Sequence, residues 1–252
     1  MKNQNIHINR DIHNDLGAYH YEDDNVTVVS EDSFEDILDT VGNLPDDGRT
    51  VVTPELSLLN ADELADLQKF MKNFMTPIQL HARMERLLES TRDSTNTVLV
   101  GAPIASKKHG YNNGLYIVRN GETIQKQRKS LPGVFEENSG IFTYEDDPNR
   151  YKTSMGAVAV ICSELPMTYD LSALEKQAKT FYMPAAWGVE SLDPAKAKRD
   201  YGSVDEYNEA TLNASAQLAA SEAPNLEKIY IADRPMSGSP QVGKLEIHRT
   251  ED

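Results

Sequence analysis

The sequence predicts an α/β fold, and three observations support this prediction. Short runs rich in Val and Ile, each of strand length, alternate along the chain with segments whose apolar residues recur at helical spacing. The run over residues 155–164 is apolar until it ends in polar residues, which is typical of a strand buried on both faces. A chain of 252 residues can bury a sizeable core without disulfides or metals.

The domain organisation is predicted from composition along the chain. No internal repeat, low-complexity tract or linker divides the sequence, so we predict a single domain over residues 25–252. Residues 1–24 are polar, and we expect them to form a loosely docked N-terminal extension. The histidines of this extension match the ligand spacing of no common metal site: they are His7, His13 and His20.

The overall composition excludes several classes of function. The formal net charge is -15 and the sequence pI is about 4.8, so nucleic acid and anionic membrane surfaces are poor partners. A single cysteine permits no disulfide within the chain, which fits a reducing compartment. The sequence shows neither a signal-peptide pattern nor an apolar run of membrane-spanning length. We therefore expect a soluble, cytoplasmic protein.

Periodicity and turn residues predict the elements of the first half. Phe34, Ile37 and Val41 recur at helical spacing behind acidic residues, which favours a helix. An Asn-Gly pair between two strand-like runs predicts a tight hairpin. The predicted strands lie at 25–30, 50–53 and 97–103, the predicted helices at 33–44, 60–74 and 79–90, and the hairpin at 114–118 and 122–128.

The second half begins with a long polar loop over residues 138–154, of a size that is often functional or mobile. The buried run follows, and Cys162, the only cysteine, lies at its carboxyl end. The remaining predicted elements are a helix at 171–179, a strand at 180–186, an alanine-rich helical region from 193 to about 221, and closing strands at 228–233 and 243–247.

Three ionisable residues come directly after predicted strands: Glu55, Lys129 and Cys162. In open α/β sheets, ligands tend to lie outside the carboxyl ends of strands. Each residue also has an ordinary alternative. A glutamate there can begin a helix beside the amide dipoles, a lysine after a hairpin can be a solvated surface charge, and a strand cysteine can be a small core residue. The three local sequences, taken together and in order, are more informative.

These local sequences resemble the motifs of the nitrilase superfamily of carbon–nitrogen hydrolases. The family's first motif is an apolar run ending in Pro-Glu, its second contains Arg-Lys before a further glutamate, and its third is Gly, an apolar run and Ile-Cys before an acid. The matching segments are Val51-Val52-Thr53-Pro54-Glu55, Arg128-Lys129 with Phe135-Glu136, and Gly156 through Ile161-Cys162-Ser163-Glu164. Supporting matches are Val100-Gly101-Ala102-Pro103, Tyr111-Asn112 and Met183-Pro184-Ala185-Ala186-Trp187. The resemblance covers about residues 50–187.

The resemblance implies a four-layer αββα sandwich with the site at one end of its two sheets. It implies that Cys162 is the nucleophile, Glu55 the general base and Lys129 the stabiliser of the tetrahedral intermediate, with Glu136 bracing the site. These types suit the chemistry because an amide or nitrile carbon is a poor electrophile and a thiol is mostly protonated near neutrality. A neighbouring base and cation activate the thiol, and the cation also stabilises the developing oxyanion.

Three further residues are candidates for substrate binding. The Ser163 backbone N–H can donate to the oxyanion, as donors next to a nucleophile often do. Trp187 can line the pocket or pack as a core indole, and Tyr111 can face the site or be an ordinary turn residue. The resemblance implies no metal and no organic cofactor, because three side chains complete the chemistry. It also implies a homo-oligomer, by analogy alone.

The expected function is therefore cysteine-dependent hydrolysis of a non-peptide carbon–nitrogen bond in a small amide, ureido compound or nitrile. An amidase is preferred to a nitrilase, because amide hydrolysis is the commoner outcome on this framework. Two alternatives stay open. One is a non-catalytic protein that binds a small molecule or a partner on the same scaffold. The other is an acyltransferase that passes the thioester to an amine instead of water.

Overall fold

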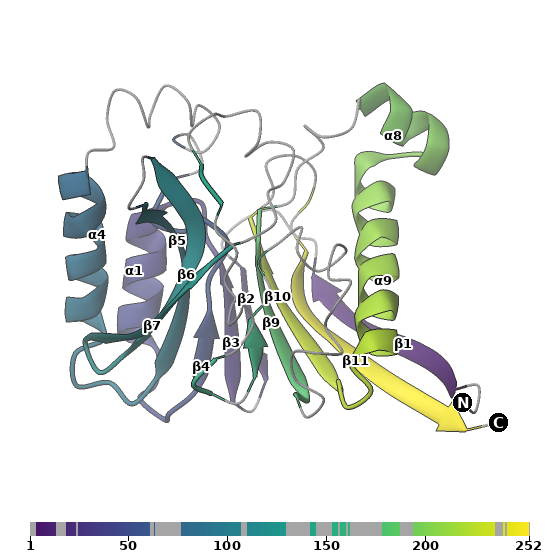
Figure 1. Cartoon of the computed structure of the whole chain (residues 1–252), viewed down its shortest axis with the longest axis horizontal. Helices are drawn as coiled ribbons and strands as arrows, with labels where there is room; N and C mark the ends of the chain where they lie inside the picture. The colour runs from purple at the N-terminus through teal and green to yellow at the C-terminus, as the bar shows by residue number, and fades with distance from the viewer. Residues whose placement is uncertain are drawn as a thin grey trace.

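The computed structural model shows an α/β protein with two mixed β-sheets that lie face to face, with helices outside them (Figure 1). The residues that it describes are 4–13, 19–23, 25–60, 63, 77–106, 110–129, 142–144, 153–155, 157–159, 161, 178–186, 194–234, 239 and 241–251. This result confirms the predicted α/β class.

The sheets are named here after a central strand of each. The β5 sheet contains β2 (Tyr19–Asp23), β3 (Val26–Ser30), β4 (Thr50–Val52), β5 (Thr97–Ala105), β6 (Tyr111–Arg119) and β7 (Glu122–Arg128), side by side in that order. The β9 sheet has the order β1 (Gln4–His13), β11 (Val242–Glu251), β10 (Lys228–Asp233), β9 (Thr180–Ala185) and β8 (Val158–Ala159). The described helices are α1 (Phe34–Asn43), α4 (Pro77–Ser90), α8 (Pro194–Tyr201) and α9 (Val204–Glu222).

Parallel strands form the centre of each sheet, and antiparallel strands extend it. The strands β3, β4 and β5 run parallel, as do β8, β9 and β10. The hairpin of β6 and β7 adds to one sheet, and β11 with β1 adds to the other. Because parallel strands end at the same edge of a sheet, residues that follow them are brought close together.

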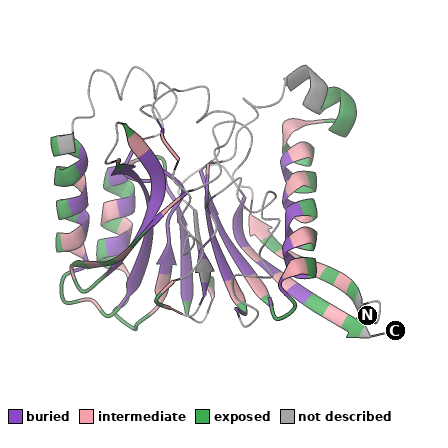
Figure 2. Cartoon of the chain, viewed as in Figure 1, coloured by how far each residue is buried: buried purple, intermediate pink, exposed green. Residues whose placement is uncertain are grey.

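The apolar side chains explain why these elements pack in this order. Leu99 and Ile117 of the β5 sheet share a buried cluster with Phe181 and Ile231 of the β9 sheet. On the other side of the β5 sheet, alternate residues such as Val98 pack with α1 and α4. The helix α9 lies outside the β9 sheet, and Figure 2 shows its buried residues on the side of the helix that is turned toward that sheet. Among the described helices, none has the length and apolarity to span a membrane.

The N-terminal residues differ from the loosely docked extension expected from their polarity. The strand β1 pairs with β11 along all 10 of its residues, and β2 pairs with β3. Ile6, Ile8 and Ile12 pack against the core, while the polar residues between them are exposed or half-buried. An edge strand needs apolar residues on one face only, so a polar average is compatible with a docked strand. The division into an extension and a domain over 25–252 stays a prediction.

Most other predicted elements are confirmed, with their ends shifted by a few residues. Asn120 and Gly121 have φ of 50° and 70°, the left-handed conformations that a two-residue hairpin turn requires. Pro77 begins α4, where its missing N–H costs nothing. The predicted helical region from 193 divides at Gly202, where Ser203 caps α9. Most residues of the predicted helices at 60–74 and 171–179, and half of the residues of the predicted strand at 155–164, lie outside the described residues.

Candidate active site

Glu55 begins a tight turn, three residues after Val52 ends β4. Residues 55–59, called the Glu55 turn below, are all buried, and Leu56 has φ of 55°, in the left-handed region that non-glycine residues seldom adopt. Ser57 holds the turn, because its Oγ donates to the carbonyl oxygen of Gly101 at 3.0 Å. Pro54 cannot extend the strand ladder, so the sequence itself ends β4 and releases the chain into the turn.

Gly101 allows the Glu55 turn to cross the neighbouring strand. A Cβ at Gly101 would lie 2.3 Å from the Pro54 oxygen and 2.7 Å from the Glu55 Cα, distances at which the backbone would have to move. Leu99, two residues earlier in β5, faces the core between the sheets, so Gly101 faces the same way. The missing side chain therefore lets Glu55 pass over β5, on its inner face, toward β6 and β7.

Glu55 and Lys129 form a buried ion pair. The Lys129 ammonium donates to Glu55 Oε1 at 2.8 Å. The Lys129 side chain is only 2% exposed and the Glu55 side chain only 4%. Lys129 follows β7, and its backbone N–H donates to the Asn113 oxygen in β6 at 2.8 Å, which continues the hairpin ladder. Removing two charges from water costs several kcal/mol for each ion, and the attraction between the two opposite charges offsets part of this cost.

Two further donors reach the Glu55 carboxylate. The Asn113 amide donates to Oε1 at 2.5 Å, and the Ala186 backbone N–H donates to Oε2 at 3.1 Å. The Glu55 N–H in turn donates to the Ala185 oxygen at 3.2 Å. All three donors to the carboxylate favour its charged form. Glu55 therefore spans the seam between the sheets, because Ala185 ends β9 whereas Asn113 belongs to β6.

A second polar link joins the sheets beside Lys129. Gln127, two residues before Lys129, is buried, and its amide donates to the Ala159 oxygen at 2.6 Å. Ala159 ends β8 and lies three residues before Cys162 in the sequence. The strand that leads to Lys129 is thus tied to the strand that leads toward the cysteine.

The structure brings together two of the predicted site residues, Glu55 and Lys129. Tyr111 begins β6 and is half-buried, and this burial raises the pKa of its hydroxyl. Ile161 is fully buried. The other predicted site residues lie outside the described part of the chain: Glu136, Cys162, Ser163 and Trp187.

Sequence reasoning missed Asn113 and the Ala186 backbone N–H. Asn113 had a usable signal, since it is a polar residue directly before the apolar run 114–118, and the structure shows it within β6 and fully buried. No signal in the sequence could identify Ala186, because its contribution comes from the backbone and depends on how the two sheets pack.

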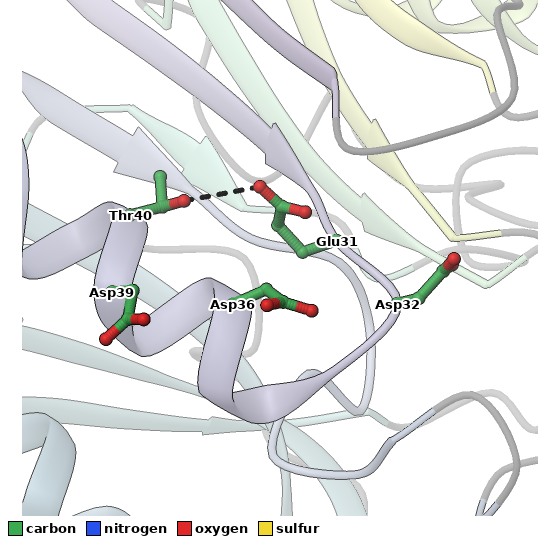
Figure 3. A pocket seen from close by; sticks show the side chains of 5 residues that line it. All are labelled: Glu31, Asp32, Asp36, Asp39 and Thr40. Carbon is green, nitrogen blue, oxygen red and sulfur yellow. Dashed lines mark hydrogen bonds between the residues drawn. The ribbon is translucent and has the colours of Figure 1, made fainter.

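An acidic hollow of about 350 Å³ lies beside α1, and the residues that line it do not include Glu55 or Lys129. Figure 3 shows its lining residues, Glu31, Asp32, Asp36, Asp39 and Thr40. The Thr40 hydroxyl donates to Glu31 Oε1 at 3.2 Å, and the four carboxylates would repel an anionic ligand. Within the part of the chain that the structure describes, no group of three or more His, Cys, Asp or Glu side chains could hold a metal ion.

The fold and the site define an α/β protein with a buried acid–amine pair at the seam of two mixed sheets. No protein-family model matches the chain, and no curated protein matches it. Among solved structures, a cysteine-to-serine mutant of the Nesterenkonia AN1 amidase from the nitrilase superfamily matches with a TM-score of 0.58 and 15% identity. The match covers 83% of this chain and 74% of the amidase. The chain thus has the fold of a nitrilase-superfamily amidase, which confirms the resemblance at the level of the fold.

Two more structures show the same similarity. One is a glutamate-to-glutamine mutant of the amidase from Nesterenkonia sp. AN1, described as showing Michael addition of acrylamide at the active site cysteine. It has a TM-score of 0.57 and 13% identity, over 87% of this chain and 89% of that one. The other is the glutamine-dependent NAD+ synthetase from Acinetobacter baumannii in complex with ADP, with a TM-score of 0.53 and 14% identity, over 86% of this chain and 42% of that one. Such identities establish a shared fold, and a fold by itself assigns no function.

Proposed function

We propose that this protein is a cysteine-dependent hydrolase of non-peptide carbon–nitrogen bonds, acting on a small amide, ureido compound or nitrile. The observation that carries the proposal is the buried ion pair of Glu55 and Lys129, 2.8 Å apart, within the fold of a nitrilase-superfamily amidase. Cys162 is the nucleophile, Glu55 the general base, Lys129 the oxyanion stabiliser and Glu136 a bracing residue. An amide is preferred to a nitrile as substrate.

The proposed reaction has two halves. Glu55 takes the thiol proton of Cys162, and the sulfur attacks the carbonyl carbon. The carbon–nitrogen bond breaks as Glu55 gives the proton to the leaving nitrogen, so ammonia or an amine departs and a thioester remains. Glu55 then takes a proton from water, which attacks the thioester. The carbon–sulfur bond breaks, the carboxylic acid leaves, and Glu55 gives its proton to the sulfur, which restores the free thiol. Lys129 stabilises the tetrahedral oxyanion in both halves.

The pairing of β8 with β9, two neighbouring strands of the β9 sheet, supports the role of Cys162. The strand β8 is parallel to β9 with Ala159 opposite Tyr182. Cys162 follows Ala159 by three residues, as Ala185 follows Tyr182 by three. Ala185 is the residue whose carbonyl accepts the Glu55 N–H, so the same register, if continued, leads the cysteine toward the base.

The remaining parts of the proposal concern the architecture and the binding residues. The placement of α1 and α4 outside one sheet and α9 outside the other supports a four-layer αββα sandwich (Figure 1). Ser163, Trp187 and Tyr111 are proposed to contact the substrate. A homo-oligomer, a cytoplasmic location and the absence of nucleic-acid and membrane partners stay predictions.

The wild-type protein is expected to release ammonia from at least one member of a panel of small amides, carbamoyl amino acids and nitriles. Its single thiol is also expected to react rapidly with iodoacetamide near pH 7, because a neighbouring base and cation activate it. Mass spectrometry of the intact protein measures this rate, and a turned-over substrate should slow it. A thiol that reacts no faster than free cysteine, together with no ammonia from the panel, would contradict the proposal.

The same assay separates hydrolysis from acyl transfer. If amines added to an active reaction are acylated in preference to water, the protein is an acyltransferase that uses the same thioester. Products that contain only the free acid support the hydrolase.

Gly101→Ala is expected to lower turnover by at least about tenfold and stability by about 1–3 kcal/mol, because the new Cβ would push the Glu55 backbone away from Lys129. Turnover and the urea midpoint of unfolding measure the two effects. Gly42→Ala in α1 is the matched control, since its nearest neighbour would be the Ser90 Cβ at 3.9 Å, an ordinary contact. Equal turnover in the two variants would show that the close approach at Gly101 does not position Glu55.

A further inference from the structure

A buried arginine connects the Glu55 turn with the β9 sheet. Arg234 directly follows β10, and its backbone N–H donates to the Ala185 oxygen at 3.1 Å. Its side chain crosses to the β5 sheet, although the residue is only 3% exposed. The guanidinium donates to three backbone oxygens there: those of Leu59 at 2.7 Å, Leu56 at 2.9 Å and Glu31 at 3.4 Å.

The chemistry of these contacts is unusual for a buried charge. In the described part of the chain, the hydrogen-bond partners of the Arg234 guanidinium are carbonyl oxygens and none is a carboxylate. Burial lowers the pKa of Arg234 to about 10. A buried cation is costly unless its hydrogen bonds compensate, so the carbonyl groups must be held firmly against it. Two of these carbonyl groups belong to the Glu55 turn.

We propose that Arg234 is a positioning residue that fixes the Glu55 turn to the β9 sheet and thereby sets the distance between the base and the nucleophile. This inference rests on the proposed function. Glu55 and Lys129 follow strands of the β5 sheet, whereas the segment that leads to Cys162 belongs to the β9 sheet. The site can assemble only if the two sheets are held in register at this end. The planar guanidinium supplies this link, because its N–H groups donate to the carbonyl oxygens of Leu56, directly after Glu55, and of Leu59, at the end of the turn.

A second arginine holds the same turn from the other side. Arg83 of α4 donates to the Leu58 oxygen at 2.5 Å and pairs with Glu63 at 2.7 Å. Arg83 fixes the turn to α4, a helix that packs on the β5 sheet, and among the described residues its hydrogen-bond partners do not include a residue of the β9 sheet. Loss of Arg83 should therefore loosen Glu55 less than loss of Arg234.

Arg249 in β11 provides a matched control. Its guanidinium also donates to three backbone oxygens, those of Leu226 at 2.6 Å, Ala220 at 2.9 Å and Ala223 at 3.0 Å. Desolvation by burial lowers its pKa as well. These oxygens lie at the end of α9 and just after it, and none belongs to the Glu55 turn. The two arginines therefore share their chemistry and differ in what they hold.

The experiment compares Arg234→Lys with Arg249→Lys. A lysine keeps the charge but loses the fork, so both variants should lower the melting temperature. Arg234→Lys is expected to reduce kcat by about 10- to 100-fold with little change in KM, and to slow iodoacetamide labelling of Cys162 near pH 7 by a comparable factor. Arg249→Lys should stay within about twofold of the wild type in both rates.

Equal kcat and labelling rates in the two lysine variants would overturn the inference while leaving the proposed function in place. A wild-type protein with neither ammonia release nor an activated thiol would overturn both. If Arg234→Lys does not accumulate as folded protein, Arg234→Gln keeps an amide donor for the same carbonyl oxygens without the buried charge. That variant should lose at least about threefold in kcat and in the labelling rate, and wild-type rates in it would overturn the inference.

Discussion

Replacement of Cys162 by serine is expected to reduce amide hydrolysis by roughly 10³-fold or more without loss of the fold. Serine has nearly the same shape, but its hydroxyl is a far weaker acid than a thiol, and a buried carboxylate such as Glu55 cannot remove its proton as readily. The rate of ammonia release with the best substrate of the panel measures the loss. Circular dichroism and the urea midpoint of unfolding should stay close to the wild-type values.

Cys162→Ala is the companion variant, because it leaves no nucleophile at all. Since the chain has a single cysteine, both variants should also show no iodoacetamide adduct under conditions that label the wild type fully. Hydrolysis at the wild-type rate in either variant would exclude the cysteine as nucleophile, whatever the position of Glu55 and Lys129.

The parts of the fold that could be predicted from the sequence are those whose local pattern matches their environment. The apolar strand β5 is buried along nearly all of its length, and the Asn120-Gly121 turn has the backbone that its residues favour. The strand β1 was missed because its register with β11, and not its average polarity, places Ile6 and Ile8 on the core. Its alternating isoleucines are a period-two signal that composition alone conceals.

The site divides in the same way. The residue types around Glu55 and Lys129 are local features, so motif resemblance could find both. Their meeting depends on the passage of Glu55 over Gly101, which no local pattern encodes. The carbonyl oxygens that Arg234 binds come together only where the ends of β3, β4 and β10 meet. Because these partners are backbone atoms, no residue type in the sequence identifies them.

The buried Glu55–Lys129 pair is expected to contribute to stability mainly as a unit. Glu55→Gln and Lys129→Met are each expected to destabilise the fold by about 3–5 kcal/mol, because each removes one of two opposite charges that face each other in a buried site. The double variant should recover most of that loss, since it buries neither charge. All three variants should lack turnover, because the base, the cation or both are missing.

The hydrogen bonds of Glu55 make the glutamine variant especially informative. The carboxylate accepts from Lys129 and Asn113 on one oxygen and from the Ala186 N–H on the other. A glutamine has one oxygen and one NH2 group. Either the Asn113 amide or the Ala186 N–H must therefore face the NH2 group, which is itself a donor. Part of the loss in Glu55→Gln should therefore persist in the double variant, whereas the loss caused by unpaired charge should disappear.

Urea unfolding of the four proteins measures this cycle, and the coupling between the two sites is the sum of the single losses minus the loss in the double variant. A coupling of about 2 kcal/mol or more indicates a buried charge pair, and a value near zero would mean that water reaches the pair and screens it. A double variant that regains stability without regaining turnover would show that the pair is retained for chemistry, because the fold can do without it. Turnover in that variant would place the base elsewhere and remove the central support of the proposed mechanism.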